Sequence, residues 1–146
     1  MNHPEKLRLG DILVQQKLIT QAQLEFALAE QLRQKQNGRR LGRVLVEQGL
    51  VSEDQISETL ATQFNIPFIN LKHYNVNEKI SRRLSEIYAR RFRSVVLNES
   101  NGKLLIGMVD PTDTSTIDKI AHILGGEIEL AVVTEGQMLE IFDQMY

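Results

Sequence analysis

The sequence predicts an α+β fold in which a helical unit precedes a small unit built around a β-sheet. Two copies of a segment with helical spacing occupy the first half of the chain. Three short apolar runs in the second half have the length of strands, and an Asn-Gly pair at 101–102 lies between two of them. We therefore expect a four-helix tandem-repeat subdomain over residues 1–65 and a small α/β sandwich with a sheet of three to four strands over residues 66–146.

An internal repeat organises the first half of the chain. Residues 8–31 align without a gap on residues 40–63, and 11 of the 24 aligned positions are identical. Self-similarity of this kind indicates one supersecondary unit that is used twice. The repeat is the strongest signal in the sequence.

Each copy of the repeat is typical of two helices joined by a turn. Gly49 lies where the first helix of the second copy should end, because glycine accepts the left-handed conformation there. The first copy has Lys17 at this position, where a side chain costs about 1 kcal/mol. Apolar residues recur at i, i+3 and i+4, the spacing of one helical face, at Leu9, Ile12 and Leu13 and again at Leu41, Val44 and Leu45.

The second helix of each copy is predicted to begin with a capping box. Thr20 pairs with Gln23 in the first copy, and Ser52 pairs with Gln55 in the second. The Asn-Gly pair at 37–38 predicts the end of the helix that begins at Thr20.

Packing in a hydrophobic core accounts for the repeated leucines but not for the repeated polar residues. Each copy opens with Arg-Leu-Gly, and a glycine inside a helix costs about 1 kcal/mol relative to alanine. The glycine indicates either close approach of the backbone to another group or a helix start with free amides, which suit phosphate oxygens. Arg8 and Arg40 can bind phosphate or stack on a base, and Gln31 and Gln63 offer a donor and an acceptor to a base edge.

With these residues the chain resembles the MshEN domain, the N-terminal regulatory module of bacterial type IV pilus and type II secretion assembly ATPases. The family motif is Arg-Leu-Gly, aliphatic pairs around a glycine, then Leu, Leu and Gln over 24 residues, and the chain matches it at residues 8–31 and 40–63. Three features depart from the motif: Lys17 replaces a glycine, Ile56 replaces a leucine, and the spacer from Leu32 to Arg39 is long. The segment at 107–113, Gly-Met-Val-Asp-Pro-Thr-Asp, is also similar to one found in secretion ATPases.

The resemblance implies binding of cyclic di-GMP, with each motif holding about half of the two-fold symmetric ligand. It implies a bacterial, cytoplasmic protein without a cofactor and an ATPase domain C-terminal to this chain. Amides near the motif glycines are then the expected phosphate contacts. The expected ligand-binding residues are Arg8, Leu9, Gly10, Leu24, Leu28 and Gln31 of the first motif, Arg40, Leu41, Gly42, Ile56, Leu60 and Gln63 of the second, and Asp110.

The second half alternates strands with helices. The Ile-Pro pair at 66–67 marks a break from helix into extended chain, since proline disfavours helix in the residue before it. The expected elements are a helix over 77–91, strands over 94–98 and 103–109, a helix over 115–124, a strand over 127–133 and a helix over 135–146.

Asp110 lies in a polar turn and has two interpretations. A carboxylate accepts two hydrogen bonds from the Watson–Crick edge of guanine, so Asp110 can reach the ligand across the junction of the two units. A turn or helix-capping aspartate before Pro111 is the alternative.

Composition and motifs exclude several classes of function. Apolar residues make up 42% and charged residues 25%, which argues against disorder, and no apolar run approaches the roughly 18 residues of a membrane span. Cysteine is absent, and no nucleotide-hydrolysing or metalloprotease motif is present. His3, His73 and His122 are scattered. We expect neither catalysis nor a metal site.

The alternative function is docking to an inner-membrane assembly protein without nucleotide binding. Residues 72–93 hold seven basic side chains against two acidic ones, which indicates either a solvated helix face or a surface for an acidic partner. A helix-turn-helix protein that binds DNA is not favoured, because the net charge is -2 and the repeat lacks a basic recognition helix.

Overall fold

The helical unit begins with two helix–turn–helix pairs, one from each copy of the repeat. In this computed structural model, which describes residues 8–33 and 40–146, the four helices are α1 (Leu9–Gln15), α2 (Gln21–Arg33), α3 (Leu41–Glu47) and α4 (Glu53–Phe64). The predicted helix end at 37–38 and His3 lie outside the described residues.

The turns within the two pairs have the predicted geometry. Lys17 has φ 63° and Gly49 has φ 76°, so both copies use a left-handed residue to end the first helix. Both capping boxes are present. The Thr20 and Ser52 side chains accept hydrogen bonds from the amides of Gln23 and Gln55 at 3.1 and 3.0 Å, and the glutamine side chains accept from the cap amides at 2.8 and 2.9 Å. Lys17 therefore does not prevent the turn.

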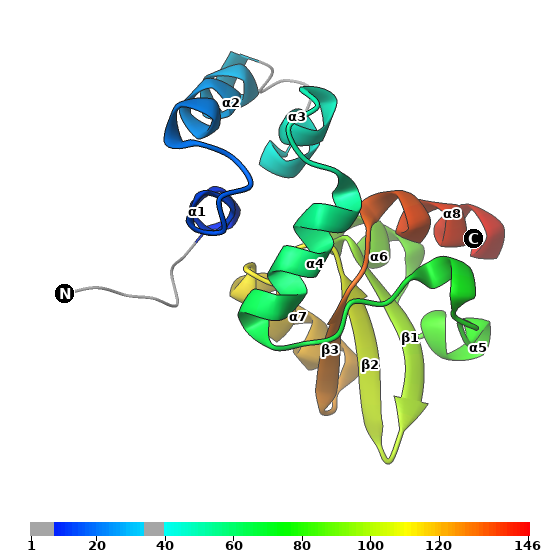
Figure 1. The fold of residues 1–146 in the computed structure, drawn as a ribbon. Helices are drawn as coiled ribbons and strands as arrows, with labels where there is room; N and C mark the ends of the chain where they lie inside the picture. Colours follow the sequence, from blue (N-terminus) through cyan, green and yellow to red (C-terminus); the bar gives the residue numbers. More distant parts are fainter. Residues whose placement is uncertain (1–7, 34–39) are drawn as a thin grey trace.

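The second half forms a three-stranded mixed sheet with helices around it (Figure 1). Strand β1 (Ser94–Ser100) pairs antiparallel with β2 (Lys103–Met108), and β2 pairs parallel with β3 (Ile128–Val132). The antiparallel pair is the hairpin that the Asn-Gly turn predicts, and Asn101 and Gly102 both have positive φ. A helix, α7 (Thr114–Leu124), makes the crossover that a parallel pair requires, and α8 (Glu135–Met145) follows β3.

The helix expected over residues 77–91 is wrong as a single element. The structure has two short helices there, α5 (Glu78–Ser81) and α6 (Glu86–Phe92), preceded by a 3-10 turn η3 (Leu71–His73). Leu84, in the break, is fully buried, and Ser85 caps α6 by accepting a hydrogen bond from the Tyr88 amide at 3.4 Å. The prediction failed because apolar residues keep a helical spacing across the break, where Leu84 is buried in the core of the sheet unit.

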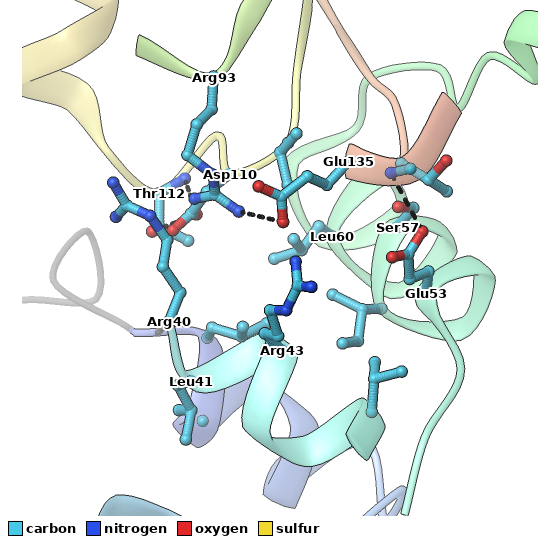
Figure 2. A pocket seen from close by; sticks show the side chains of 18 of the residues that line it. Arg40, Leu41, Arg43, Glu53, Ser57, Leu60, Arg93, Asp110, Thr112 and Glu135 are labelled. Atoms are coloured by element: carbon cyan, nitrogen blue, oxygen red, sulfur yellow. Dashed lines mark hydrogen bonds and ion pairs between the residues drawn. The ribbon is translucent and has the colours of Figure 1, made fainter. Parts of the chain in front are cut away.

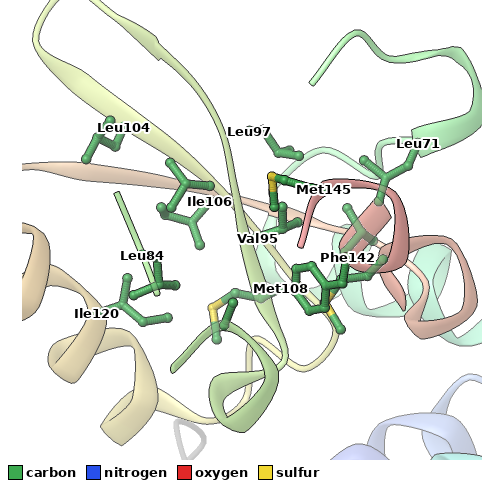
Figure 3. Packing of buried hydrophobic residues seen from close by; sticks show 14 residues of the cluster. Leu71, Leu84, Val95, Leu97, Leu104, Ile106, Met108, Ile120, Phe142 and Met145 are labelled. Atoms are coloured by element: carbon green, nitrogen blue, oxygen red, sulfur yellow. The ribbon is translucent and has the colours of Figure 1, made fainter. Parts of the chain in front are cut away.

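Two clusters of buried side chains support the fold. One, packed between the sheet and its helices, includes Leu84, Met108, Ile120 and Phe142 (Figure 3). The other fills the space between the four repeat helices and also includes Val132 of β3, because α4 rests on that strand. The α+β class with a helical unit and a three-stranded sheet is therefore confirmed. Within the described residues, no helix is both long enough and apolar enough to cross a membrane.

Candidate functional site

A cleft of about 620 Å³ lies where the repeat helices meet the sheet unit. It is a size that suits a small ligand. The first motif contributes Arg8, Leu9, Gly10, Leu28 and Gln31, and the second contributes Arg40, Leu41, Gly42, Arg43, Val46, Glu47, Glu53, Ile56, Ser57 and Leu60. The sheet unit contributes Arg93, Val109, Asp110, Thr112, Thr134, Glu135, Gly136 and Leu139.

The two motifs meet through their Leu-Gly pairs in a reciprocal arrangement. A Cβ atom on Gly10 would lie 2.5 Å from Leu24 of its own motif and 3.2 Å from Leu41 of the other motif. A Cβ atom on Gly42 would face the equivalent positions, 3.6 Å from Ile56 and 3.4 Å from Leu9. The motif glycines therefore allow the two copies to pack closely, with approximate two-fold symmetry, beside the cleft.

The two halves of the cleft differ in exposure. Leu28 and Leu60 occupy the same position in their motifs, yet Leu28 is 40% exposed and Leu60 is 1% exposed. The difference arises because α4 packs against β3, which covers Leu60. The cleft is therefore open to solvent at Leu28, whereas its end at Leu60 is roofed by the sheet unit.

Charged side chains from three elements converge at the roofed end of the cleft (Figure 2). Arg40 precedes α3, Arg93 ends α6 and precedes β1, and Glu135 opens α8. Arg93 and Asp110 come together because the Val109 amide donates a hydrogen bond to the Arg93 carbonyl at 3.3 Å, which extends the β1–β2 pairing by one residue.

Arg93 is held in a costly environment. Its side chain is 16% exposed and lies 3.5 Å from the carboxylate of Glu135, and its Nε has no hydrogen-bond partner. Burial lowers the pKa of the Arg93 guanidinium, the charge of Glu135 opposes this, and the nearby charge of Arg40 lowers the pKa further. Arg93 also has φ 50°, a left-handed conformation in which an L-residue costs about 1 kcal/mol or more.

Asp110 both structures the turn and faces the cleft. Its Oδ1 accepts hydrogen bonds from the amide of Thr112 at 2.9 Å and from the Thr112 hydroxyl at 2.5 Å. This is the turn role that the sequence allowed. Asp110 also lines the cleft, so the same carboxylate is available to a ligand.

The structure brings most of the predicted site residues together. Eleven of the thirteen line the cleft, and the exceptions are Leu24 and Gln63. Leu24 is 4% exposed and packs beneath Gly10, so it supports the site from below. Gln63 is exposed near the C-terminal end of α4, outside the lining residues.

Sequence reasoning missed the sheet-unit residues other than Asp110. Arg93, Thr112 and Glu135 are brought to the cleft by strand pairing and by the packing of α4 on β3, which no local pattern reports. Arg43 of the second motif was also missed, because its counterpart in the first motif is Asp11. Within the part of the chain that the structure describes, no group of three His, Cys, Asp or Glu side chains is placed to hold a metal ion.

Comparison with known proteins gives two sequence matches. The family model for the MshEN domain matches residues 64–146, which are the last residue of α4 and the sheet unit. The type IV pilus assembly ATPase PilB of Myxococcus xanthus (strain DK1622) is 32% identical over 139 residues, 95% of this chain. The chain spans 24% of the length of that protein.

Solved structures also resemble the whole chain. The structure of MshE with cdg, cyclic di-GMP, is 37% identical and has a TM-score of 0.76, covering 96% of this chain and 99% of that one. The N-terminal domain of XpsE has a TM-score of 0.79 at 22% identity and covers 100% of this chain and 99% of that one, which shows a shared fold. The sequence matches include both repeats through PilB and the sheet unit through the family model, and on these grounds the chain belongs to the MshEN domain family.

Proposed function

We propose that this chain is a non-catalytic regulatory module that binds cyclic di-GMP in the cleft between its two motifs and its sheet unit. The observation that carries the proposal is the reciprocal packing of two equivalent motifs beside one cleft. The 37% identity to MshE, which is known in complex with this dinucleotide, supports the same ligand.

The symmetry of the ligand matches the symmetry of the motifs. Cyclic di-GMP has two identical halves, and an approximate two-fold pair of motifs offers each half a similar set of side chains. Guanine faces lie against the leucines of the cleft, where they remove apolar area from water. Arg8 and Arg40 supply charge-assisted contacts, and Asp110 accepts hydrogen bonds from a guanine edge.

The backbone amides near Gly10 and Gly42 are proposed to bind the phosphates of the ligand, as expected from the sequence. Both glycines line the cleft, and Gly10 is the more enclosed of the two because Leu24 and Leu41 pack over it. Gln31 lines the cleft and is proposed to contact a base edge of the first half-site, whereas Gln63 is exposed and lies outside the lining residues.

The module is proposed to regulate an ATPase of a type IV pilus or type II secretion machine. PilB, a pilus assembly ATPase, supports this role because 24% of its length matches the chain. A ligand that binds between the motifs and the sheet unit favours one arrangement of the two and so biases whatever is attached to them. Residues 1–65 and 66–146 are proposed to be the two subdomains, and the host machine is proposed to act in the bacterial cytoplasm.

Calorimetric titration with cyclic di-GMP tests the ligand. We expect one dinucleotide per chain, loss of at least about tenfold in affinity for Arg8→Ala and for Arg40→Ala, and no heat with GTP. Arg83→Ala is the matched control, because Arg83 pairs with Glu99 away from the cleft. Folded protein that gives no heat with cyclic di-GMP would contradict the proposal.

Docking to an inner-membrane assembly protein is the less favoured role. Four of the seven basic side chains in the segment that suggested it are paired within the chain: Arg82 with Glu78, Arg83 with Glu99, Arg90 with Glu86 and Asp143, and Arg93 with Glu135. An acidic partner must compete with these carboxylates. A pull-down that survives charge reversal at Arg82, Arg83, Arg90 and Arg91 would remove the remaining support.

A further inference from the structure

Arg93 has more hydrogen-bonding capacity than the protein uses. A guanidinium carries five N–H donors, and a tight charge-assisted contact to a carboxylate has a length of about 2.7–2.9 Å. The contact between Arg93 and Glu135 is 3.5 Å, and the Nε group is buried without a partner. A buried donor without a partner is costly, so a ligand oxygen that reaches it is favoured.

The backbone at Arg93 points the same way. A helix that ends in a left-handed residue usually has glycine or asparagine there, and α4 ends in that manner at Asn65. Helix α6 instead ends at Arg93, with φ 50° and ψ 52°. Arg93 thus lines the cleft from a backbone conformation that favours a smaller residue, and strained positions of this kind are common at functional sites.

A second arginine faces the same space. Figure 2 shows Arg40 and Arg93 reaching from opposite units toward Asp110. Among the described residues, Arg40 has no ion-pair partner, and its charge acts unfavourably on Arg93. A monoanionic group between two guanidinium groups relieves their repulsion and satisfies their free donors.

We propose that Arg93 binds a phosphate of the cyclic dinucleotide together with Arg40, with Glu135 holding Arg93 in place until the ligand arrives. The inference rests on the proposed function and adds a residue from the sheet unit to the phosphate-binding set. One phosphate then connects α3 of the second motif to the junction of α6 and β1. The two units are thereby joined through the ligand.

Arg93→Gln and Arg93→Lys separate a phosphate contact from a base contact. A phosphate accepts a lysine as a point charge, whereas the two-acceptor edge of guanine needs the arginine fork. We expect cyclic di-GMP affinity to fall at least about tenfold in Arg93→Gln and only about threefold in Arg93→Lys. Arg83→Gln, which breaks a similar ion pair outside the cleft, should bind as the unchanged chain does.

Phosphorus NMR of the saturated complex reads the contact directly. The bound ligand should give two phosphorus resonances, and Arg93→Lys should move one of them and leave the other in place. Glu135→Gln should tighten binding a few-fold, because Arg93 no longer has to leave a carboxylate. A urea titration of each variant without ligand checks that it is folded.

The outcomes are distinct. Wild-type affinity in folded Arg93→Gln, or unchanged phosphorus resonances in Arg93→Lys, overturns the role of Arg93 and leaves the dinucleotide site intact. If Arg93→Gln does not fold, the resonances of Arg93→Lys and the affinity of Glu135→Gln decide. Absence of binding by the unchanged chain overturns this inference and the proposed function together.

Discussion

Lys17 occupies a position that favours glycine. It has φ 63°, and Gly49, its counterpart in the second motif, has φ 76°. Both residues are exposed, and a Cβ atom at position 49 would meet no other atom within 4 Å. The cost at position 17 is therefore one of backbone conformation alone.

Exchanging the residue types at these two turns should shift stability in opposite directions. We expect Lys17→Gly to raise the free energy of unfolding by about 0.5–1 kcal/mol and Gly49→Ala to lower it by about 1 kcal/mol. Urea denaturation followed by circular dichroism measures both. A destabilised Lys17→Gly variant would mean that the lysine side chain makes a stabilising contact.

Individual residues of the candidate site could be predicted from the sequence where they occupy repeated positions of the two motifs. Most of the predicted residues that line the cleft come from the Arg-Leu-Gly openings and the spaced leucines, because two copies of a pattern mark positions that a single copy cannot. Arg93 lay in a basic run and carried no such mark. Its place beside Asp110 follows from the register of β1 on β2, and register is a property of the folded sheet.

At the scale of elements, the packing of α1 against α3 is tight at one glycine and looser at the other. Gly10 and Gly42 both hold the second position of a seven-residue helix. An alanine at Gly10 would meet a buried Leu24 at 2.5 Å, whereas an alanine at Gly42 would find its neighbours at 3.4 Å and beyond. The helix propensity gained by alanine is the same in both cases.

The two alanine variants should therefore differ in their free energy of unfolding. Gly10→Ala is expected to lower the free energy of unfolding by about 1–3 kcal/mol, since overpacking forces Leu24 and Leu41 to move. Gly42→Ala is expected to change it by less than about 1 kcal/mol, in the stabilising direction. Thermal and urea unfolding of the pair measures the difference, and equal effects would contradict the asymmetry of the two contacts.

Element boundaries were predictable where the chain carries a cap or a turn residue. The capping box gave the correct start of α4, and the Asn-Gly pair gave the correct position of the β1–β2 turn, although β1 runs to Ser100, two residues beyond the strand expected over 94–98. The segment around residue 84 was predicted wrongly because apolar spacing cannot tell a continuous helix from two short ones. Ser85, a good capping residue, was the signal that favours a new helix there.

At the scale of the molecule, the cleft draws on both motifs and on the sheet unit. A ligand in it binds the folded chain and not the unfolded one, so it stabilises the fold by mass action. Cyclic di-GMP at about 100 times its dissociation constant should raise the free energy of unfolding by about 2.7 kcal/mol. For a chain of this size that corresponds to a rise of roughly 5–10 °C in Tm.

Asp110→Asn should reduce this rise at the same ligand concentration. Asparagine can still accept the hydrogen bonds from Thr112, so the turn is kept, but it lacks the charge and one acceptor that a guanine edge uses. Differential scanning calorimetry with and without the dinucleotide measures the shift, with GTP as the control. An unchanged shift would restrict Asp110 to its turn role.

The segment after α4 is fastened to the strand on which α4 rests. The Val132 amide donates to the Pro67 carbonyl at 2.8 Å, the Ile69 amide donates to the Val132 carbonyl at 3.0 Å, and Phe68 bridges Val132 in parallel. Helix α4 therefore cannot swing away from the sheet without breaking the hydrogen bonds of the backbone amide and carbonyl groups of the buried Val132. If ligand binding draws the two motifs together, we expect α1, α2 and α3 to move toward the ligand while α4 stays fixed on the sheet unit.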